Sequence, residues 1–266
     1  MSDLAHQWHG SGEPLVFIAG LGGKGTSWHP FLNTAASTHR ILTFDNRGAG
    51  KSPPLFGPTT LRELGADVLR LLDHLQIERV PVIGRSMGGM IAQELALLAP
   101  SRVSKLVLVC TAGRSDPQLA GIFGLWAEMA ERGMPADIRH RTSMAWCLGR
   151  EFARNPARLN RYLQSKGGGA DRAADYAIQA RACAQHDALD RLAELRIPTL
   201  VVAGRDDRLT PPCYAEELAR VIPGAQLACI PGAGHLAYLE SPARFASVTL
   251  GFLKEHNDDA ELRRAG

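Results

Sequence analysis

Short runs of apolar residues alternate along this chain with longer segments whose apolar residues recur at helical spacing. The apolar runs cover residues 15–19, 41–44, 80–83, 106–109, 199–203 and 226–230. Such near-continuous runs are typical of strands that are buried on both faces of a sheet. The helical segments are residues 61–75, 87–99, 214–221 and 242–254. The alternation predicts an α/β fold, with a mostly parallel, doubly wound sheet between layers of helices.

The middle of the chain differs from both ends. Residues 115–191 are rich in Ala, Arg and Met, show no strand pattern and are helical in spacing, with breaks near residues 133–135, 155–156 and 166–169. Strand candidates lie on both sides of this segment. We therefore interpret 115–191 as an inserted helical cap, 1–114 and 192–256 as the core, and 257–266 as a polar tail that we expect to be frayed.

Composition excludes several classes of protein. The 266 residues have a formal net charge of +3 and no run of five basic residues, which argues against nucleic-acid binding. The five cysteines are scattered without a C-x-x-C pair, so neither a disulfide framework nor a zinc site is indicated. The start of the chain lacks the features of a signal peptide, and no apolar stretch has the ~18 residues of a membrane span. We expect a cytoplasmic protein with no metal and no membrane partner, and the oligomeric state stays open.

Two glycine-rich segments resemble nucleotide-binding loops without meeting their requirements. Residues 20–25 match G-x-G-x-x-G and Asp45 follows about twenty residues later, but Pro30 falls where the required helix should already be running. Residues 48–52 end like a P-loop, but Asp45 occupies the position of its first glycine and Pro53-Pro54 follows where a helix is needed. We therefore expect no nucleotide cofactor.

The segment Gly84-Arg85-Ser86-Met87-Gly88 matches G-x-S-x-G in the context that this motif requires. A strand candidate precedes it and a helical segment follows it without a loop. The chain must then turn sharply at Ser86, which strains its backbone and exposes its hydroxyl. Ser86 is our candidate nucleophile, and the Met87 N–H, at the helix N-terminus, is a candidate oxyanion donor.

A serine nucleophile needs a base, and the base needs a carboxylate to orient it. Asp206 and Asp207 both follow the strand candidate at 199–203, and His235 lies in a Gly-rich loop after the strand candidate at 226–230. These positions are at the same sheet edge as Ser86. His235 is the candidate base, and the residues alone leave the two aspartates open. The first glycine-rich loop can offer the Leu21 N–H as the second oxyanion donor.

Together these segments resemble the α/β-hydrolase superfamily over nearly the whole chain. The resemblance rests on residues 19–23, the turn at 44–52, the elbow at Ser86, Gly204-x-x-Asp207-x-x-x-Pro211 and the loop ending at His235. It implies an α/β-hydrolase fold whose helical cap roofs the pocket, and it selects Asp207 as the acid. Within the superfamily, the chain resembles small bacterial hydrolases of the 3-oxoadipate enol-lactone hydrolase and carboxylesterase types, and its loop at 20–28 is similar to aminoacrylate hydrolases.

Two positions depart from the family pattern. Many members have His-Gly before the oxyanion loop, where this chain has Ala19-Gly20. Arg85 precedes the nucleophile where the family often has His or a small polar residue, and it either contacts a substrate carboxylate or forms a salt bridge. Further candidate substrate contacts are Trp28, Trp126 and Trp146, with packing inside the cap as the alternative for the last two.

These observations predict a cofactor-free serine hydrolase with the triad Ser86, His235 and Asp207. Its substrate would be a small carboxylic ester or lactone, cleaved through an acyl-enzyme. Three alternatives stay open: hydrolysis of a carbon–carbon bond in a vinylogous diketone, a cofactor-free haloperoxidase side activity, and a ligand-binding receptor with vestigial hydrolysis. The sequence leaves the substrate's identity and size open.

Overall fold

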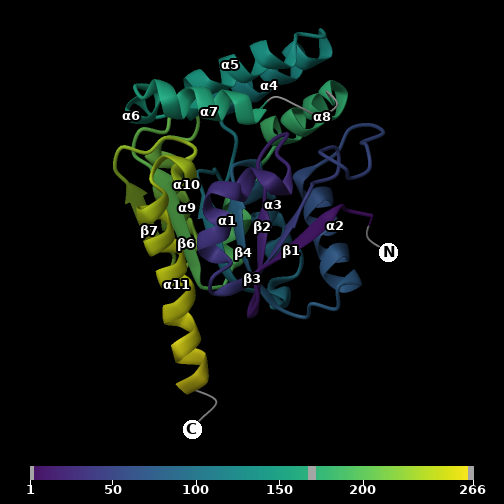
Figure 1. The fold of residues 1–266 in the computed structure, drawn as a ribbon. Coiled ribbons are helices and arrows are strands. Elements are labelled where there is room, and N and C mark those ends of the chain that lie inside the picture. The colour runs from purple at the N-terminus through teal and green to yellow at the C-terminus, as the bar shows by residue number, and fades with distance from the viewer. Residues whose placement is uncertain (1–2, 167–171, 263–266) are drawn as a thin grey trace.

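The computed structural model describes residues 3–166 and 172–262, and in this part of the chain seven strands form one sheet (Figure 1). The strands are β1 His6–His9, β2 Glu13–Ile18, β3 His39–Phe44, β4 Val80–Arg85, β5 Val103–Val109, β6 Thr199–Gly204 and β7 Gln226–Ile230. Their order across the sheet is β1-β3-β2-β4-β5-β6-β7. β1 pairs antiparallel with β3, and the other neighbours pair in parallel. The predicted fold class is thereby confirmed.

Every apolar run of the sequence analysis coincides with a strand of this sheet. β1 is a short strand of four residues that precedes the first apolar run. Pro81 lies inside β4 although proline lacks an N–H for the sheet ladder. The pairing of β4 with β5 shifts register between Val80 and Val82, so Pro81 occupies an irregularity, as proline in a central strand requires.

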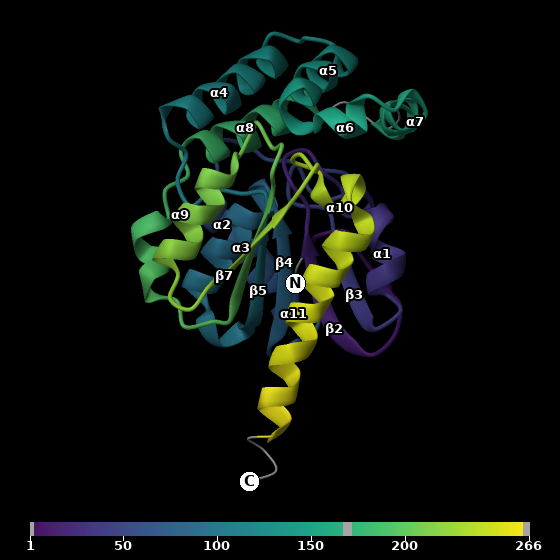
Figure 2. The same cartoon turned by 90° about the vertical axis from the view of Figure 1, so that its left-hand side faces the viewer.

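Helices cover both faces of the sheet (Figure 2). One face carries α2 Leu61–His74, α3 Met87–Leu98 and α9 Pro212–Val221, and the other carries α1 His29–Ala35, α10 Ala237–Glu240 and α11 Pro242–Leu262. Short 3-10 helices are η1 Gly25–Trp28, η2 Pro100–Arg102 and η3 Leu189–Glu194. Successive strand residues serve opposite layers: Val82 packs with the α2 and α3 side and Ile83 with the α1 and α11 side. This two-sided burial explains why the strands lack polar alternation.

In the described residues between β5 and β6, five α-helices lie over the carboxyl edge of the sheet (Figures 1 and 2). They are α4 Pro117–Glu131, α5 Ala136–Cys147, α6 Arg150–Ala153, α7 Pro156–Lys166 and α8 Ala173–Ala184. Arg114 and Asp187 form an isolated antiparallel bridge where the chain enters and leaves this layer. The Ser115 N–H donates to the His186 carbonyl at 2.9 Å beside it. The two segments that connect the insertion to the core are thus paired with each other, close to the predicted boundaries. Of the break predicted at 166–169, residues 167–169 lie outside the described residues.

The C-terminal helix differs from its prediction. α11 continues to Leu262, past the start of the predicted tail at residue 257. Once a helix has formed, each added residue gains a hydrogen bond without a new nucleation step, so a polar sequence can extend it. Residues 263–266 lie outside the described residues. None of the helices in the described ranges combines the length and apolar character that crossing a membrane requires.

Candidate active site

Ser86 lies between the last residue of β4 and the first residue of α3, with φ 56° and ψ −125°. A positive φ is sterically unfavourable for a residue with a side chain. Two hydrogen bonds hold this conformation: the Ser86 N–H donates to the Val109 carbonyl at 2.9 Å, and the Thr111 hydroxyl donates to the Ser86 carbonyl at 2.8 Å. The strained elbow predicted at Ser86 is therefore present in the fold.

Two glycines give this turn its room. A Cβ atom at Gly84 would lie 2.3 Å from the Gly88 carbonyl oxygen, and one at Gly88 would lie 2.2 Å from the Ile18 carbonyl oxygen. Backbone atoms cannot yield to such contacts, so both positions need glycine. The close approach also sets the N-terminus of α3 directly against the end of β2, where the glycine-rich loop begins.

The sheet order brings this loop and the elbow together. β2 and β4 are neighbours, and the chain order reverses between them, which makes this the topological switch point of the sheet. The loop after β2 carries Leu21, and the elbow after β4 carries Met87. Neither backbone N–H donates to a described residue outside its own element. Both remain candidate oxyanion donors, as the sequence predicted.

Asp207 and His235 form a buried pair. His235 Nδ1 and Asp207 Oδ2 are 2.8 Å apart, and their side chains are 2% and 0% exposed. Asp207 also accepts hydrogen bonds from the N–H groups of Leu209 and Thr210 and from the Thr210 hydroxyl. These donors fix the carboxylate, which in turn holds a proton on Nδ1 and leaves the lone pair on Nε2.

The geometry separates the two adjacent aspartates that the residues alone left open. Asp206 uses its backbone N–H to bind the Ala233 carbonyl at 2.8 Å, and its side chain is half-buried. Only Asp207 of the two hydrogen-bonds to His235. The pattern that selected Asp207 therefore points to the aspartate that contacts the imidazole.

His235 Nε2 is buried and has no hydrogen-bond partner among the described residues. The Ser86 hydroxyl likewise forms no hydrogen bond with a described residue, so the expected bond between the two side chains is not made in this structure. The segments that carry the two residues are nevertheless neighbours. Cys110 follows the Val109 carbonyl that binds the Ser86 N–H, and its Sγ lies within 4.8 Å of the facing atoms of Asp207 and His235. Such bonds often tighten only when substrate is bound.

The loop with Leu21 is held by the cap through a residue that no sequence motif indicates. Gln179 of α8 is 0% exposed; its Oε1 accepts the Gly22 N–H at 3.0 Å and its Nε2 donates to the Arg47 carbonyl at 2.8 Å. Gly22 has φ +62°, and a Cβ atom there would lie 2.8 Å from the Tyr176 ring. The cap therefore fixes the residue next to the proposed oxyanion donor.

A second buried residue ties the cap to the His235 loop. Glu240 accepts hydrogen bonds from the N–H groups of Gly149 at 3.0 Å, Gly234 at 2.9 Å and Leu236 at 3.3 Å. The His235 N–H itself donates to the Cys147 carbonyl at 2.8 Å. Burial raises the pKa of Glu240, and the N–H donors oppose that shift. Spacing and composition gave no signal for this role, because its partners are backbone groups from distant segments.

Comparison with known proteins agrees with this architecture. A model of the alpha/beta hydrolase fold matches residues 13–242. BpoC of Mycobacterium tuberculosis, provisionally named a non-heme bromoperoxidase, is 34% identical over 257 residues, which cover 95% of this chain and 98% of that protein. 

The chain belongs to the alpha/beta hydrolase family.

Two further members of the family bear the names of different activities. The 3-oxoadipate enol-lactonase 1 of Acinetobacter baylyi is 32% identical over 241 residues, covering 90% of this chain and 88% of that enzyme. The solved structure of a thermophilic esterase from Thermogutta terrifontis superposes with a TM-score of 0.85 at 29% identity, covering 95% and 93% of the two chains. Family membership thus leaves the substrate to be argued from the site.

The predicted substrate contacts of this alpha/beta hydrolase divide into different environments. Trp28 is 0% exposed, and its ring centre lies 4.9 Å from that of Phe17 and 5.1 Å from that of Tyr238, in the apolar layer below the site, so its contact with substrate stays a prediction. Trp126 is 5% exposed and packs edge-on against Phe123. Trp146 is half-buried against the same apolar cluster, so its contact with substrate, like that of Trp126, stays a prediction.

The two glycine-rich segments that resemble nucleotide-binding loops have a structural role. Asp45 accepts the Gly25 N–H on Oδ1 and the Lys51 N–H on Oδ2, each at 2.8 Å, and so ties the two glycine-rich segments together. α1 begins only at His29, after η1. The first loop therefore does not run directly into the helix that a pyrophosphate site would need.

One group of possible metal ligands lies in the described part of the chain, at Cys110, Asp207 and His235. Asp207 Oδ2 and His235 Nδ1 already form a hydrogen bond with each other. Burial raises the pKa of the Cys110 thiol well above its usual range, which opposes the thiolate that a metal would need. This donor set therefore fits a hydrogen-bonded pair better than a cation site.

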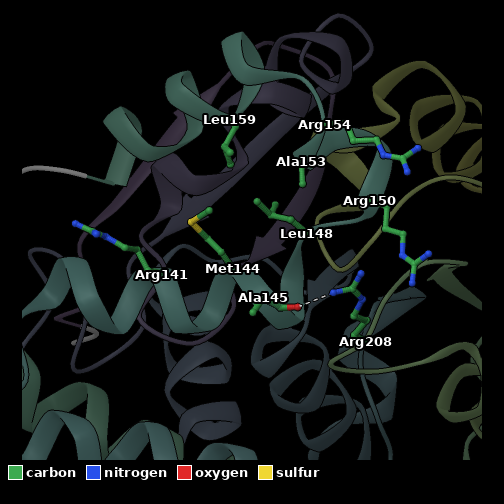
Figure 3. Close-up of a pocket in the computed structure, with 9 residues that line it drawn as sticks. All are labelled: Arg141, Met144, Ala145, Leu148, Arg150, Ala153, Arg154, Leu159 and Arg208. Carbon is green, nitrogen blue, oxygen red and sulfur yellow. Dashed lines mark hydrogen bonds between the residues drawn. The ribbon is translucent and has the colours of Figure 1, made fainter.

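A cavity of about 610 Å³ lies between cap helices and Arg208 of the core (Figure 3). Its lining combines apolar side chains with four arginines. The lining residues are Arg141, Met144, Ala145, Leu148, Arg150, Ala153, Arg154, Leu159 and Arg208. Arg208 donates to the Ala145 carbonyl at 3.3 Å. Ser86, Asp207 and His235 do not line this cavity, so it is distinct from the candidate catalytic centre.

Proposed function

We propose that this alpha/beta hydrolase is a serine hydrolase that cleaves a small carboxylic ester or lactone through an acyl-enzyme. The observation that carries the proposal is the buried Asp207–His235 pair, which leaves Nε2 without a partner in a site that also contains the strained Ser86. An oriented imidazole with a free basic nitrogen is what a serine nucleophile requires.

In the acylation step, Ser86 Oγ attacks the carbonyl carbon while its proton passes to His235 Nε2. The Leu21 and Met87 N–H groups stabilise the negative oxygen of the tetrahedral intermediate. The bond to the alcohol oxygen then breaks, and the imidazolium returns its proton to that oxygen. Asp207 stabilises the imidazolium and keeps the ring in place.

In the deacylation step, water attacks the acyl-enzyme as His235 Nε2 accepts one of its protons. The second tetrahedral intermediate collapses to the carboxylic acid, and the proton returns to Ser86 Oγ. No oxidant or reductant is consumed. For a lactone, the same bonds break, and the product is a single hydroxy acid.

The decisive experiment compares wild type, Ser86→Ala and the exposed-serine control Ser247→Ala on short-chain esters, lactones and a vinylogous diketone. We expect wild type and the control to turn over an ester or lactone, and Ser86→Ala to lose about 10⁴-fold or more in kcat. Near wild-type turnover by Ser86→Ala would refute the proposal. Turnover of the diketone alone would assign carbon–carbon hydrolysis, and labelling of Ser86 by a fluorophosphonate without turnover would favour the receptor alternative.

A further inference from the structure

Arg85, the residue before the candidate nucleophile, is a buried cation without a counter-charge. It is 7% exposed, and its Nε is buried without a hydrogen-bond partner. Its guanidinium forms no ion pair and no hydrogen bond with any residue in the described ranges. The salt bridge that the sequence left open as one role of Arg85 is therefore not formed.

Two other buried charges in the described part of the chain are paired with an opposite charge. Glu94 is bound by Arg191 at 2.6 Å, Asp175 by Arg172 at 2.7 Å. Leaving one charge of a buried pair without its partner is strongly destabilising. The unpaired Arg85 guanidinium therefore indicates a place where an anion from outside the chain is favoured.

The guanidinium borders the reaction centre. A Cβ atom built on Gly20, the glycine before Leu21, would lie 3.1 Å from Arg85 Nη2 and 3.2 Å from Ser86 Cβ. The Arg85 head group and the nucleophile thus flank one point beside the oxyanion loop. A substrate whose carbonyl is at Ser86 would bring its near substituents within reach of Arg85.

The other neighbours of Arg85 add donors or aromatic surface and no free carboxylate. The guanidinium carbon lies 5.3 Å from the centre of the Tyr238 ring, and Trp28 packs against that ring with its Nε1 also buried and unpartnered. Two buried carboxylates of the neighbouring loops are engaged, Asp207 by His235 and Glu240 by backbone N–H groups. No described residue offers a hydrogen-bond acceptor to the Arg85 guanidinium, and a ligand carboxylate would supply one.

We propose that Arg85 forms a carboxylate-binding subsite, so that the substrate is a short ester or lactone that carries a free carboxylate near the scissile carbonyl. This inference rests on the proposed function and names the substrate class. A guanidinium suits this role because it donates two parallel hydrogen bonds to a carboxylate. Arg85 is then a specificity-determining residue, with Ser86 and His235 performing the chemistry.

The test uses substrates that differ only in one charge. Hydrolysis of the monomethyl and dimethyl esters of succinate, glutarate and adipate is measured for wild type, Arg85→Gln, Arg85→Lys and the control Arg154→Gln, which removes an exposed arginine of the cap. We expect kcat/KM of wild type and the control to favour the best monoester over its diester by about 10- to 100-fold. Arg85→Gln should abolish this preference while retaining hydrolysis of the diester, and Arg85→Lys should restore it in part.

A binding measurement decides the proposal independently of turnover and of the stability of the variants. Calorimetry on wild type should detect glutarate binding at least about tenfold tighter than binding of the neutral glutaramide. Equal turnover of monoesters and diesters, or equal binding of the acid and the amide, would overturn the carboxylate subsite and leave the hydrolase proposal intact. If no ester or lactone is hydrolysed, the proposed function fails, and the calorimetric comparison still decides whether the site binds carboxylates.

Discussion

Gln179, on the cap helix α8, accepts a hydrogen bond from the backbone N–H of Gly22, in the glycine-rich loop after β2, at 3.0 Å. The same amide donates to the Arg47 carbonyl at 2.8 Å. One buried side chain thus joins three segments that are far apart in the sequence. The cap therefore fixes the backbone of the loop that carries Leu21, in addition to covering the carboxyl edge of the sheet.

Replacing Gln179 by Leu should impair catalysis more than substrate binding. The change leaves the Gly22 N–H and the Arg47 carbonyl without their partners and lets the oxyanion loop move. We expect kcat to fall about 10- to 100-fold with KM changed less than threefold, and the free energy of unfolding to fall by about 1–3 kcal/mol. Steady-state kinetics and urea unfolding check these values.

The control for this experiment is Gln185→Leu, because Gln185 is an exposed glutamine at the C-terminal end of the same helix. It should leave both parameters unchanged. If Gln179→Leu lowers stability and leaves kcat at the wild-type value, Gln179 holds the fold together without positioning the oxyanion donor.

Replacing Glu240 by Gln should loosen the loop that carries His235. An amide oxygen can accept at one end only, and its NH₂ group would face the N–H groups that the carboxylate now binds. We expect kcat/KM for the ester to fall about 10- to 100-fold, since small displacements of a catalytic base are costly. The exposed Glu255→Gln is the matched control and should be neutral.

A readout besides activity separates positioning from general damage in Glu240→Gln. In wild type the proton on His235 Nδ1 lies between the buried imidazole and the buried Asp207 carboxylate. Its exchange with solvent should therefore be slow enough for its NMR resonance to be observed. The variant should show faster exchange of this proton while its circular dichroism stays native. An unchanged proton resonance together with unchanged kinetics would remove Glu240 from the positioning of His235.

His186 should contribute to loss of stability in acid. Burial, in which the imidazole contacts Gln93 at 3.2 Å, lowers its pKa from 6.5 to about 4. The unfolded chain then binds this proton more readily than the folded chain, so the free energy of unfolding falls as the pH drops from 6.5 towards 4. A shift of this size corresponds to a loss of about 3 kcal/mol across that window.

The measurement compares urea unfolding of wild type and His186→Gln between pH 4 and pH 8. Glutamine keeps a donor towards Gln93 but does not titrate, so the variant should lose less stability than wild type below pH 6.5. The difference between the two proteins should be constant above pH 7. Parallel pH curves throughout the range would show that His186 does not cause the acid sensitivity.

Much of the fold follows from local features of the sequence. The buried strands are readable because residues on both faces of each strand are apolar, and the elbow is readable because Gly84, Ser86 and Gly88 stand between a strand and a helix. The helix after residue 256 was missed, since polar composition says little about whether an established helix continues. The sequence does not separate core packing of Trp28 from a substrate contact, because an aromatic residue at the end of a loop gives the same signal in both cases.

The sequence by itself determined the strand–helix order, the strained serine and the loops that carry an acid and a histidine, because each depends on residues within a few positions of one another. The family pattern pointed to Asp207, and the tertiary structure shows its contact with His235. Only the tertiary structure decided that Gln179 and Glu240 tie the cap to the loops that carry Leu21 and His235, and that Arg85 forms no ion pair with a described residue. The contacts of Gln179 and Glu240 join side chains to backbone groups, as much as 157 positions away for Gln179. A backbone N–H or carbonyl is present at nearly every residue, so no sequence pattern marks the particular one that a distant side chain will meet.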